Sequence, residues 1–465
     1  MFKPIRIRAV ALAVVAACAS APAVAEDLMQ IYREARQADP TLAIADATKN
    51  SVGEGVDQAR AALLPQVSAS LGYLHDDNYS RGLQPNTFNA TLPPVLSSVL
   101  DNKNHSREAK GELTQTLFNW GDITRLRGAR QTAAASVSDY DAASQDLIVR
   151  TATAYFGVLT AEDQLTFAEA NEKALARQLD QAEQRYEVGL SAITDVHNAR
   201  ANHDSAVAQV IQAQNSVDNA REAVIEIIGK DFGDLKKLRE QLPLEKPQPV
   251  EMQAWVDLAV KQNPTLASRE HSLEAAEYNI STQRSGHLPT LTASVTRSDT
   301  PAWGNQTSFE QGVGGGTFHN NGLGADTSIG VQLTVPIFTG GLVSSQVRQA
   351  VFQRDVAQDQ VELQRRTVVN NARNAYRAVI AGISEVEATK QAVISAQSSL
   401  EATQAGFDVG TRTIVDVLLS QQTLFQAQSA YSQARHQFVL SGLQLKQAAG
   451  VIEAKDLEAV NALLE

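Results

Sequence analysis

The chain has 465 residues and a formal net charge of −12, with 43% hydrophobic and only 5% aromatic residues. This acidic balance disfavours nucleic acid and anionic membrane surfaces as partners. The single cysteine, Cys18, has no partner for a disulfide within the chain, and the rest of the sequence can supply neither thiol catalysis nor cysteine metal sites.

The first 25 residues have the pattern of a secretory signal peptide. Three basic residues precede an apolar run at 9–17, and the Ala-Val-Ala at 23–25 provides a small-residue cleavage site. We therefore expect an exported mature chain that begins at Glu26 and has a formal net charge of −15, because the three basic residues leave with the signal. The alternative is lipoprotein-type processing, which would lipidate Cys18.

An internal duplication organises the mature chain. The segment DPTL at 39–42 matches NPTL at 263–266, and Val188-Gly189 matches Val409-Gly410. We expect a first structural repeat at 26–230 and a second at 251–450, each with a helix, two strands and a long helical hairpin that turns at its Val-Gly pair. A proline-containing linker at 231–250 joins them, and a C-terminal segment follows at 451–465.

Two strands are predicted in each repeat, because apolar and polar residues alternate at 67–73, 291–296 and 328–335, with a weaker strand at about 106–117. The polar, Gly- and Asn-rich stretches at 76–105 and 299–326 are expected to be loops. Aromatic residues flank the strands, with Phe118, Trp120 and Phe338 at one end and Tyr73, Tyr79, Trp303 and Phe309 near the other. Such girdles are typical of the two surfaces of a membrane.

These strands are the only means of entering a membrane that the mature sequence offers, since no stretch approaches the roughly 20 apolar residues of a spanning helix. Each strand has the roughly 9 to 11 residues that cross a bilayer when tilted. Four strands cannot close a barrel, and a bilayer leaves no strand edge unpaired, so neighbouring subunits must complete the ring. The alternative is a soluble four-stranded sandwich.

Long helices are predicted within the two proline-free stretches, 95–242 and the residues after Pro336. The helix at 122–186 would span about 100 Å at ~1.5 Å per residue. A seven-residue repeat marks each returning helix, with Val196, His203, Val210, Val217 and Val224 in the first half and Val417, Leu424, Tyr431, Phe438 and Leu445 in the second. Small residues follow three positions later, as in closely packed coiled coils. Heptads alone are equally typical of an exported coiled-coil adhesin or structural spacer.

No motif for catalysis or cofactor binding is present. The glycine-rich stretch at 312–316 lacks the Lys-Ser/Thr of a phosphate-binding loop, and neither G-x-S-x-G nor H-E-x-x-H occurs. His197 and His203 are six residues apart and do not share a helical face well enough to bind a metal. We therefore expect no cofactor, no metal site and no enzymatic activity. Of the three function classes considered, an export duct is favoured first, a spacer second and a periplasmic enzyme last.

Four stretches carry a resemblance to a known family. They are DLMQIY at 27–32, GLSAITDVHNAR at 189–200, HLPTL at 287–291 and VGTRTIVDVL at 409–418. From Glu26 to about Leu464 the chain resembles the TolC family of outer-membrane efflux proteins. The resemblance implies an α+β membrane protein, a homotrimer whose four transmembrane strands per chain complete a 12-stranded barrel, with coiled-coil hairpins forming a periplasmic tunnel.

The same resemblance implies a passive duct for drug efflux and type I secretion, with the linker at the equator of the tunnel. Its partners would be a periplasmic adaptor protein and an inner-membrane transporter of the RND, MFS or ABC type. The family's constriction aspartate corresponds to Asp416, and its gate network to Thr194, Asp195 and Arg412, with Gln184 nearby. Two positions depart from the family pattern: Phe407 replaces a network tyrosine, and Leu419 replaces a second ring aspartate.

Elementary electrostatics supports a gate at these positions. Three symmetry-related copies of Asp416 at a narrow tip would attract cations and disfavour anions. Arg412 would bind Asp195 or the Thr194 hydroxyl of an adjacent hairpin through charge-assisted hydrogen bonds. The alternative for each charge is a solvated residue at a helix end, worth about 0 to 1 kcal/mol. Because Phe407 lacks the phenolic hydroxyl, it predicts a gate held by one hydrogen bond fewer, and Leu419 predicts a weaker cation site.

Overall fold

The structure, a computed structural model, describes residues 25–85, 91, 95–311 and 314–465. The predicted signal peptide up to residue 24, including the alternative lipidation site Cys18, lies outside the described residues. The helices are α1 (Leu28–Ala38), α2 (Pro40–Ala61), α3 (Trp120–Glu187), α4 (Ile193–Ile228), α5 (Met252–Gln262), α6 (Pro264–Arg284), the short 3-10 helix η1 (Ser285–His287), α7 (Leu342–Asp408), α8 (Ile414–Ala448) and α9 (Ala454–Asn461). In the described part of the chain, no helix is long and apolar enough to cross a membrane.

The chain forms two compact units, and each takes segments from both repeats. One unit consists of the described residues up to Ala45, together with Asp141–Asn263 and Arg366–Glu465. The other consists of Asp46–Tyr140 and Pro264–Arg365. The first unit holds the hairpin ends of the long helices and the linker, and the second holds the sheet.

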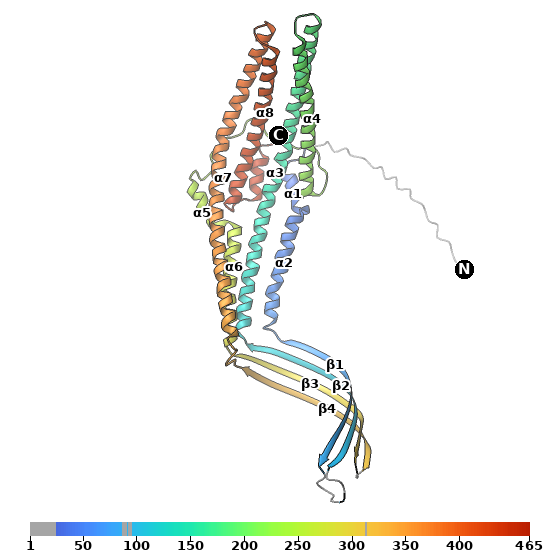
Figure 1. Ribbon diagram of the computed structural model, residues 1–465. Helices are drawn as coiled ribbons and strands as arrows, with labels where there is room; N and C mark the ends of the chain where they lie inside the picture. Colours follow the sequence, from blue (N-terminus) through green and yellow to red (C-terminus); the bar gives the residue numbers. More distant parts are fainter. Residues whose placement is uncertain (1–24, 86–90, 92–94, 312–313) are drawn as a thin grey trace, which may run out of the picture. The chain divides into compact units, whose positions relative to one another are not determined.

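The sheet of the second unit contains β1 (Gln66–Pro85), β2 (Val95–Phe118), β3 (Thr290–Glu310) and β4 (Gly314–Thr334). All neighbours are antiparallel and lie in chain order, as Figure 1 shows. β1 and β4 each pair on one side only within the described chain. The four predicted strands are therefore confirmed, and both edges of the sheet remain available for further strands.

The loops predicted at 76–105 and 299–326 are wrong over most of their length. The strands have between 20 and 24 residues and continue through these polar segments. Gly314, Gly315 and Gly316, expected to belong to a flexible loop, begin β4. In these outer segments the side chains still alternate between the two faces of the sheet, but polar residues lie on both faces. The contrast between an apolar and a polar face, by which a strand is identified from sequence, is therefore absent.

One face of the sheet is apolar and uncovered by the described chain. Cross-strand pairing places Val67, Leu113, Val295 and Ile329 in one row. Leu71, Ile329 and Leu323 are 88%, 78% and 81% exposed. The opposite face carries small polar residues such as Ser68 and Ser294. An apolar surface of this extent is exceptional on a soluble protein and marks a membrane or partner contact.

In the first unit, the predicted heptads face inward. In α4 the buried members are Val196, Ala199, Ala206, Val217, Val224 and Ile227, and in α8 they are Val417, Leu424, Ala434, Ser441 and Leu445. The remaining heptad residues are half-buried. Burial of large residues at one position and small ones at the next allows neighbouring helices to approach closely.

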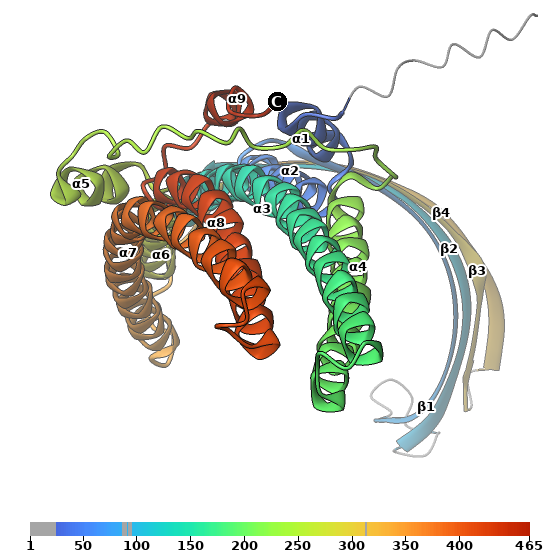
Figure 2. The same ribbon diagram turned by 90° about the horizontal axis from the view of Figure 1, so that it is seen from above.

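The linker crosses the helices of this unit without regular secondary structure (Figure 2). Tyr155 of α3, which is fully buried, donates a hydrogen bond from its hydroxyl to the Lys236 carbonyl at 2.8 Å. Its counterpart in the second repeat, Tyr376 of α7, donates to the Val250 carbonyl. Arg435 of α8 donates to the Leu238 carbonyl at 3.1 Å. Equivalent helices thus hold both ends of the linker.

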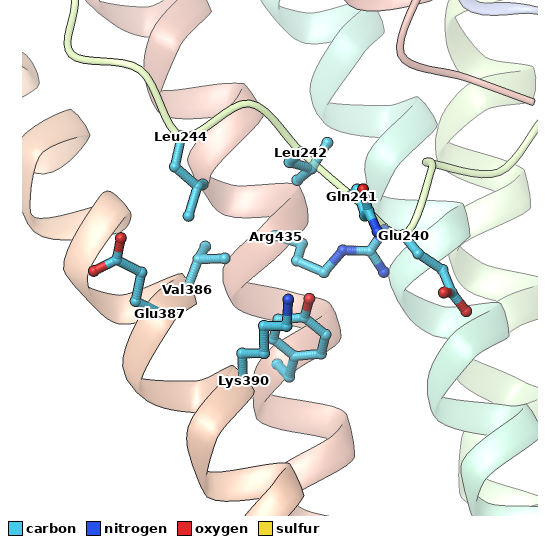
Figure 3. A pocket seen from close by; sticks show the side chains of 9 residues that line it. Glu240, Gln241, Leu242, Leu244, Val386, Glu387, Lys390 and Arg435 are labelled. Atoms are coloured by element: carbon cyan, nitrogen blue, oxygen red, sulfur yellow. The ribbon is translucent and has the colours of Figure 1, made fainter.

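A cavity of about 370 Å³ lies under the middle of the linker (Figure 3). Its walls come from the linker, α7 and α8, through Glu240, Gln241, Leu242, Leu244, Val386, Glu387, Lys390, Tyr431 and Arg435. None of the predicted gate residues lines it. Its charged walls contain two acids and two bases, so the cavity has no net preference for one sign of charge.

Candidate gate at the hairpin tips

Both hairpin turns are built in the same way. Gly189, at φ 75°, follows the end of α3, and Gly410, at φ 77°, follows the end of α7. In the first turn the Leu190 amide donates to the Arg185 carbonyl at 2.8 Å, and in the second the Thr411 amide donates to the Gly406 carbonyl at 2.8 Å. Glycine adopts this left-handed conformation at little cost. The Val-Gly pair in each repeat therefore predicted both turns correctly.

The helices that follow the turns begin differently. In α8, Thr413 is the N-cap, and its hydroxyl accepts a hydrogen bond from the Asp416 amide at 3.3 Å. Asp416 Oδ2 in return accepts hydrogen bonds from the Thr413 amide and hydroxyl, both at 2.9 Å. In α4 the N-cap is Ala192, which has no side-chain acceptor. A full capping box thus orders only the second tip.

This box fixes both the position and the charge of the predicted constriction residue. Hydrogen bonds from the backbone and side chain of Thr413, together with the nearby Arg412 charge, hold the pKa of Asp416 below its ordinary value. The carboxylate is therefore ionised at neutral pH. Its Oδ1 atom accepts no hydrogen bond in the described chain, which leaves one oxygen for a cation or a neighbouring subunit.

The acceptors predicted in the first tip lie close together. Asp195 occupies the third position of α4, as Asp416 does in α8, and accepts a hydrogen bond from the Ser191 hydroxyl at 2.6 Å. Thr194 beside it is exposed. Gln184, near the end of α3, donates to Asp180 at 2.9 Å and is also exposed. The first tip therefore offers accessible oxygen acceptors.

Arg412 lies against its own hairpin. A Cβ atom added at Gly406 would meet Arg412 Cγ at 2.7 Å, and the Arg412 amide donates to the Gly406 carbonyl at 3.2 Å. The guanidinium is exposed, and no ion pair joins it to Asp195 within the described chain. The structure brings the two residues to adjacent tips without pairing them in one subunit.

Phe407 has a role that its sequence position did not predict. The Arg185 guanidinium of α3 lies 4.7 Å from the centre of the Phe407 ring of α7, a cation–π contact between the two hairpins. The ring also packs against a buried cluster of Leu175, Ala206, Ile414 and Leu418, which come from α3, α4 and α8. Phe407 therefore joins the two hairpins through packing and a cation–π contact.

The remaining predicted position, Leu419 of α8, is 62% exposed. Other large apolar side chains at the tips are also uncovered in the described chain, with Val188 at 69%, Leu190 at 72% and Val409 at 75% exposure. These residues lie in or beside the turns. They leave exposed apolar side chains at both tips of the described chain.

Comparison with known proteins identifies the family. The sequence matches the Outer membrane efflux protein family over residues 31–230 and 255–451. The Outer membrane protein TolC of Escherichia coli (strain K12) is 38% identical over 448 residues, which cover 95% of this chain and 85% of that protein. The chain belongs to the outer membrane efflux protein family. The predicted resemblance is thereby confirmed over almost the whole chain.

Other relatives extend this family context. TolC of Vibrio cholerae is 38% identical, with 95% of this chain and 94% of that protein covered. The alkaline protease secretion protein AprF of Pseudomonas aeruginosa is 28% identical, covering 94% of this chain and 86% of that protein. The crystal structure of VceC from Vibrio cholerae shares the fold at a TM-score of 0.71 and 19% identity, covering 91% of this chain and 96% of that one.

Family membership decides between the function classes left open by the sequence. This efflux family protein is an outer-membrane protein with a long periplasmic helical extension, and it serves as an exit duct for efflux and secretion. The family is one of transport channels, so neither a coiled-coil spacer nor a soluble sandwich describes the chain. The predicted fold of four strands with long helical hairpins is confirmed.

Proposed function

We propose that three copies of this chain form a passive duct that the helical tips keep closed until a partner engages them. The observation that carries the proposal is the apolar, uncovered face of a four-stranded sheet whose β1 and β4 edges are free in the described chain. Lipid leaves no strand edge unpaired, so further strands must join both edges. Three sheets of four strands complete a 12-stranded ring.

The tips provide the closed state. Arg412 carries an exposed guanidinium beside a turn, and the adjacent tip presents Thr194, Asp195 and Gln184 as acceptors. We infer that Arg412 of one subunit pairs with these acceptors of a neighbour, because no such pair forms among the described residues of one chain. Phe407 with Arg185 joins the two hairpins of a single subunit. Opening the tip then requires that both the contact between subunits and the contact within a subunit break.

Asp416 sets the ion preference of the closed tip. The capping box holds its carboxylate ionised and in one position, and three copies around an axis place three negative charges at the constriction. Leu419 contributes no charge one turn later, so we expect a single charged ring. A single ring attracts cations less strongly than two stacked rings would.

The partners are a periplasmic adaptor and an inner-membrane transporter of the RND, MFS or ABC type. Exposed Val188, Leu190 and Val409 at the tips support docking of an adaptor there. The name of the relative AprF, an alkaline protease secretion protein, supports protein export as well as drug efflux. Substrates pass through without chemical change.

Conductance of the purified protein in a planar bilayer tests the duct and its gate. Wild-type protein should form cation-selective pores, and Asp416→Asn should lower both cation selectivity and block by trivalent cations while keeping a hydrogen-bond acceptor for the Thr413 cap. Asp218→Asn, an exposed aspartate in the body of α4 away from the turns, is the control and should leave both properties unchanged. Unchanged selectivity in Asp416→Asn would remove Asp416 from the constriction.

The proposed contact of Arg412 with a neighbouring subunit has its own test. Arg412→Ser should raise single-channel conductance, because the donor between subunits is lost. Arg177→Ser, an exposed arginine of α3 without an ion pair in the described chain, is the control and should leave the conductance unchanged. Equal conductance in Arg412→Ser and wild type would show that Arg412 does not keep the tip closed.

A further inference from the structure

A cluster of basic and aromatic side chains lies on the apolar face of the sheet, where the apolar rows end. Its members are Tyr73 and His75 of β1, His105 and Arg107 of β2, and Trp303 of β3, which cross-strand pairing places in adjacent rows. The next row outward is polar, with Asp77, Lys103 and Asn305. The cluster therefore marks a boundary on this face.

The five side chains form one connected platform. The His75 and His105 rings stack with centroids 4.4 Å apart, and the Trp303 ring lies parallel to His105 at 5.8 Å. The Tyr73 hydroxyl and His105 Nδ1 share a hydrogen bond of 2.8 Å. The Arg107 guanidinium lies 5.2 Å from the centre of the Trp303 ring. A stack of rings across three strands is thus bordered by a cation.

The charge of Arg107 is not balanced by an ion pair within the described residues. Two basic side chains nearby have acidic partners. Arg297, on the same face, pairs with Asp299 at 2.8 Å, and Lys110, on the opposite face, pairs with Glu112 at 2.8 Å. Arg107 is exposed, whereas His105 and Trp303 beneath it are half-buried. The platform therefore presents an uncompensated positive charge and imidazole nitrogens to whatever covers this face.

The distance along the strands places the platform at the outer edge of the lipid. Ten residues of β4 separate Leu333, in an apolar row, from Leu323, which pairs with Pro301 just before Trp303. At ~3.3 Å per residue and a tilt of about 45°, this segment rises about 23 Å, close to the ~25 Å height of the apolar band of membrane strands. On β3 the same span carries the Arg297–Asp299 ion pair, but on β1 and β4 it holds no charged side chain on this face. The platform begins at the outer end of this span.

We propose that this platform binds the phosphate-bearing headgroup of an outer-leaflet lipid, an inference that rests on the proposed placement of the sheet in the outer membrane. Arginine matches phosphate geometry through paired N–H donors, and imidazole N–H groups add further donors. Tyrosine and tryptophan rings favour the interface between lipid and water. The phosphate would sit between Arg107 and His75 or His105, with the acyl chains along the apolar rows.

Lipid binding to the purified full-length protein in detergent tests the proposal. Bisphosphorylated lipid A is the probe, and native mass spectrometry or a fluorescence titration gives the affinity. Arg107→Gln alone and Arg107→Gln with His105→Gln should weaken binding, the double variant by about tenfold or more, because charge-assisted hydrogen bonds are lost. Lys110→Gln, on the same strand but the opposite face, is the matched control and should bind as wild type does.

Two further arms make the result decisive. Lipid A without its phosphates should bind weakly to wild type, and inorganic phosphate alone should produce no saturable change; saturable binding of free phosphate would overturn the assignment to a lipid. Equal lipid A affinity in wild type and the double variant would also overturn it. Pore conductance of each variant is measured separately, so a protein that binds lipid A but forms no pores refutes the duct rather than the lipid site.

Discussion

His436 of α8 predicts a loss of stability in mild acid. The residue is 3% exposed and lies between α8 and α3, where its Nδ1 is 2.8 Å from the Thr160 hydroxyl. That hydroxyl donates its single proton to the Phe156 carbonyl at 2.7 Å, so it accepts from His436, which must carry its proton on Nδ1. Asn at position 436 would preserve this donor without the titrating ring.

Burial sets the size of the effect. Desolvation lowers the pKa of His436 from 6.5 to about 4, against the attraction of the Asp163 carboxylate and with added repulsion from Arg435. Between these values the unfolded chain binds a proton that the folded chain does not, so stability falls as the pH drops through 6.5 and the loss is complete near 4. At pH 4.5 the loss is about 2 to 3 kcal/mol per chain.

The assay is denaturant unfolding of the purified protein at pH 7.5 and 4.5, followed by circular dichroism, for wild type and His436→Asn. Glu162 also has a pKa raised by burial, which gives stability that is lost as pH rises, but it contributes equally to both proteins and cancels in their difference. His197→Asn, an exposed histidine of α4, is the control. If wild type and His436→Asn lose the same stability on acidification, burial of a neutral His436 is refuted.

Three further predictions concern stability and the gate. Arg150→Met should lower the free energy of unfolding by about 3 kcal/mol, because it leaves the buried Asp39 carboxylate without its charged partner. Asp39 is 4% exposed, and Arg150 donates to it at 2.8 Å. The control Arg60→Met, which removes an exposed ion pair, should lower the free energy of unfolding by less than ~1 kcal/mol in the same denaturation experiment. Phe407→Ala should raise single-channel conductance by removing the contacts between hairpins, and a conductance equal to wild type would contradict this role. Leu419→Asp should strengthen block by trivalent cations in the same bilayers, whereas weaker block would place the side chain away from the pore.

The sequence predicted elements wherever a period was unbroken and its two faces differed. The heptads of α4 and α8 and the glycine turns at Gly189 and Gly410 were correct, because each depends on local chemistry alone. The outer halves of the strands were missed, since polar residues on both faces resemble a loop. What distinguishes them is cross-strand pairing, which becomes visible only when neighbouring strands are in place.

The contacts of the candidate gate were only partly within reach of the sequence. Asp416 and Arg412 were proposed through the family resemblance. The capping box that orients Asp416 was missed, although Thr413-x-x-Asp416 before an apolar run is its sequence signature. The pairing of Arg185 with Phe407 joins residues 222 positions apart on different hairpins, and no local pattern specifies it. Contacts between hairpins depend on tertiary packing rather than on propensity.

Divergence between the repeats holds the two tip aspartates differently, which supports placing the proposed constriction at the second tip. Asp195 and Asp416 occupy the same position of equivalent helices, but Ala192 stands where Thr413 caps the second helix. Without a cap, Asp195 has Oδ2 bonded only to Ser191, while Asp416 is fixed by its own turn. A fixed carboxylate can define a constriction, and a less constrained one can change partners as the tip opens. Exchanging Ala192 and Thr413 between the repeats should therefore disturb ion selectivity without changing any charge.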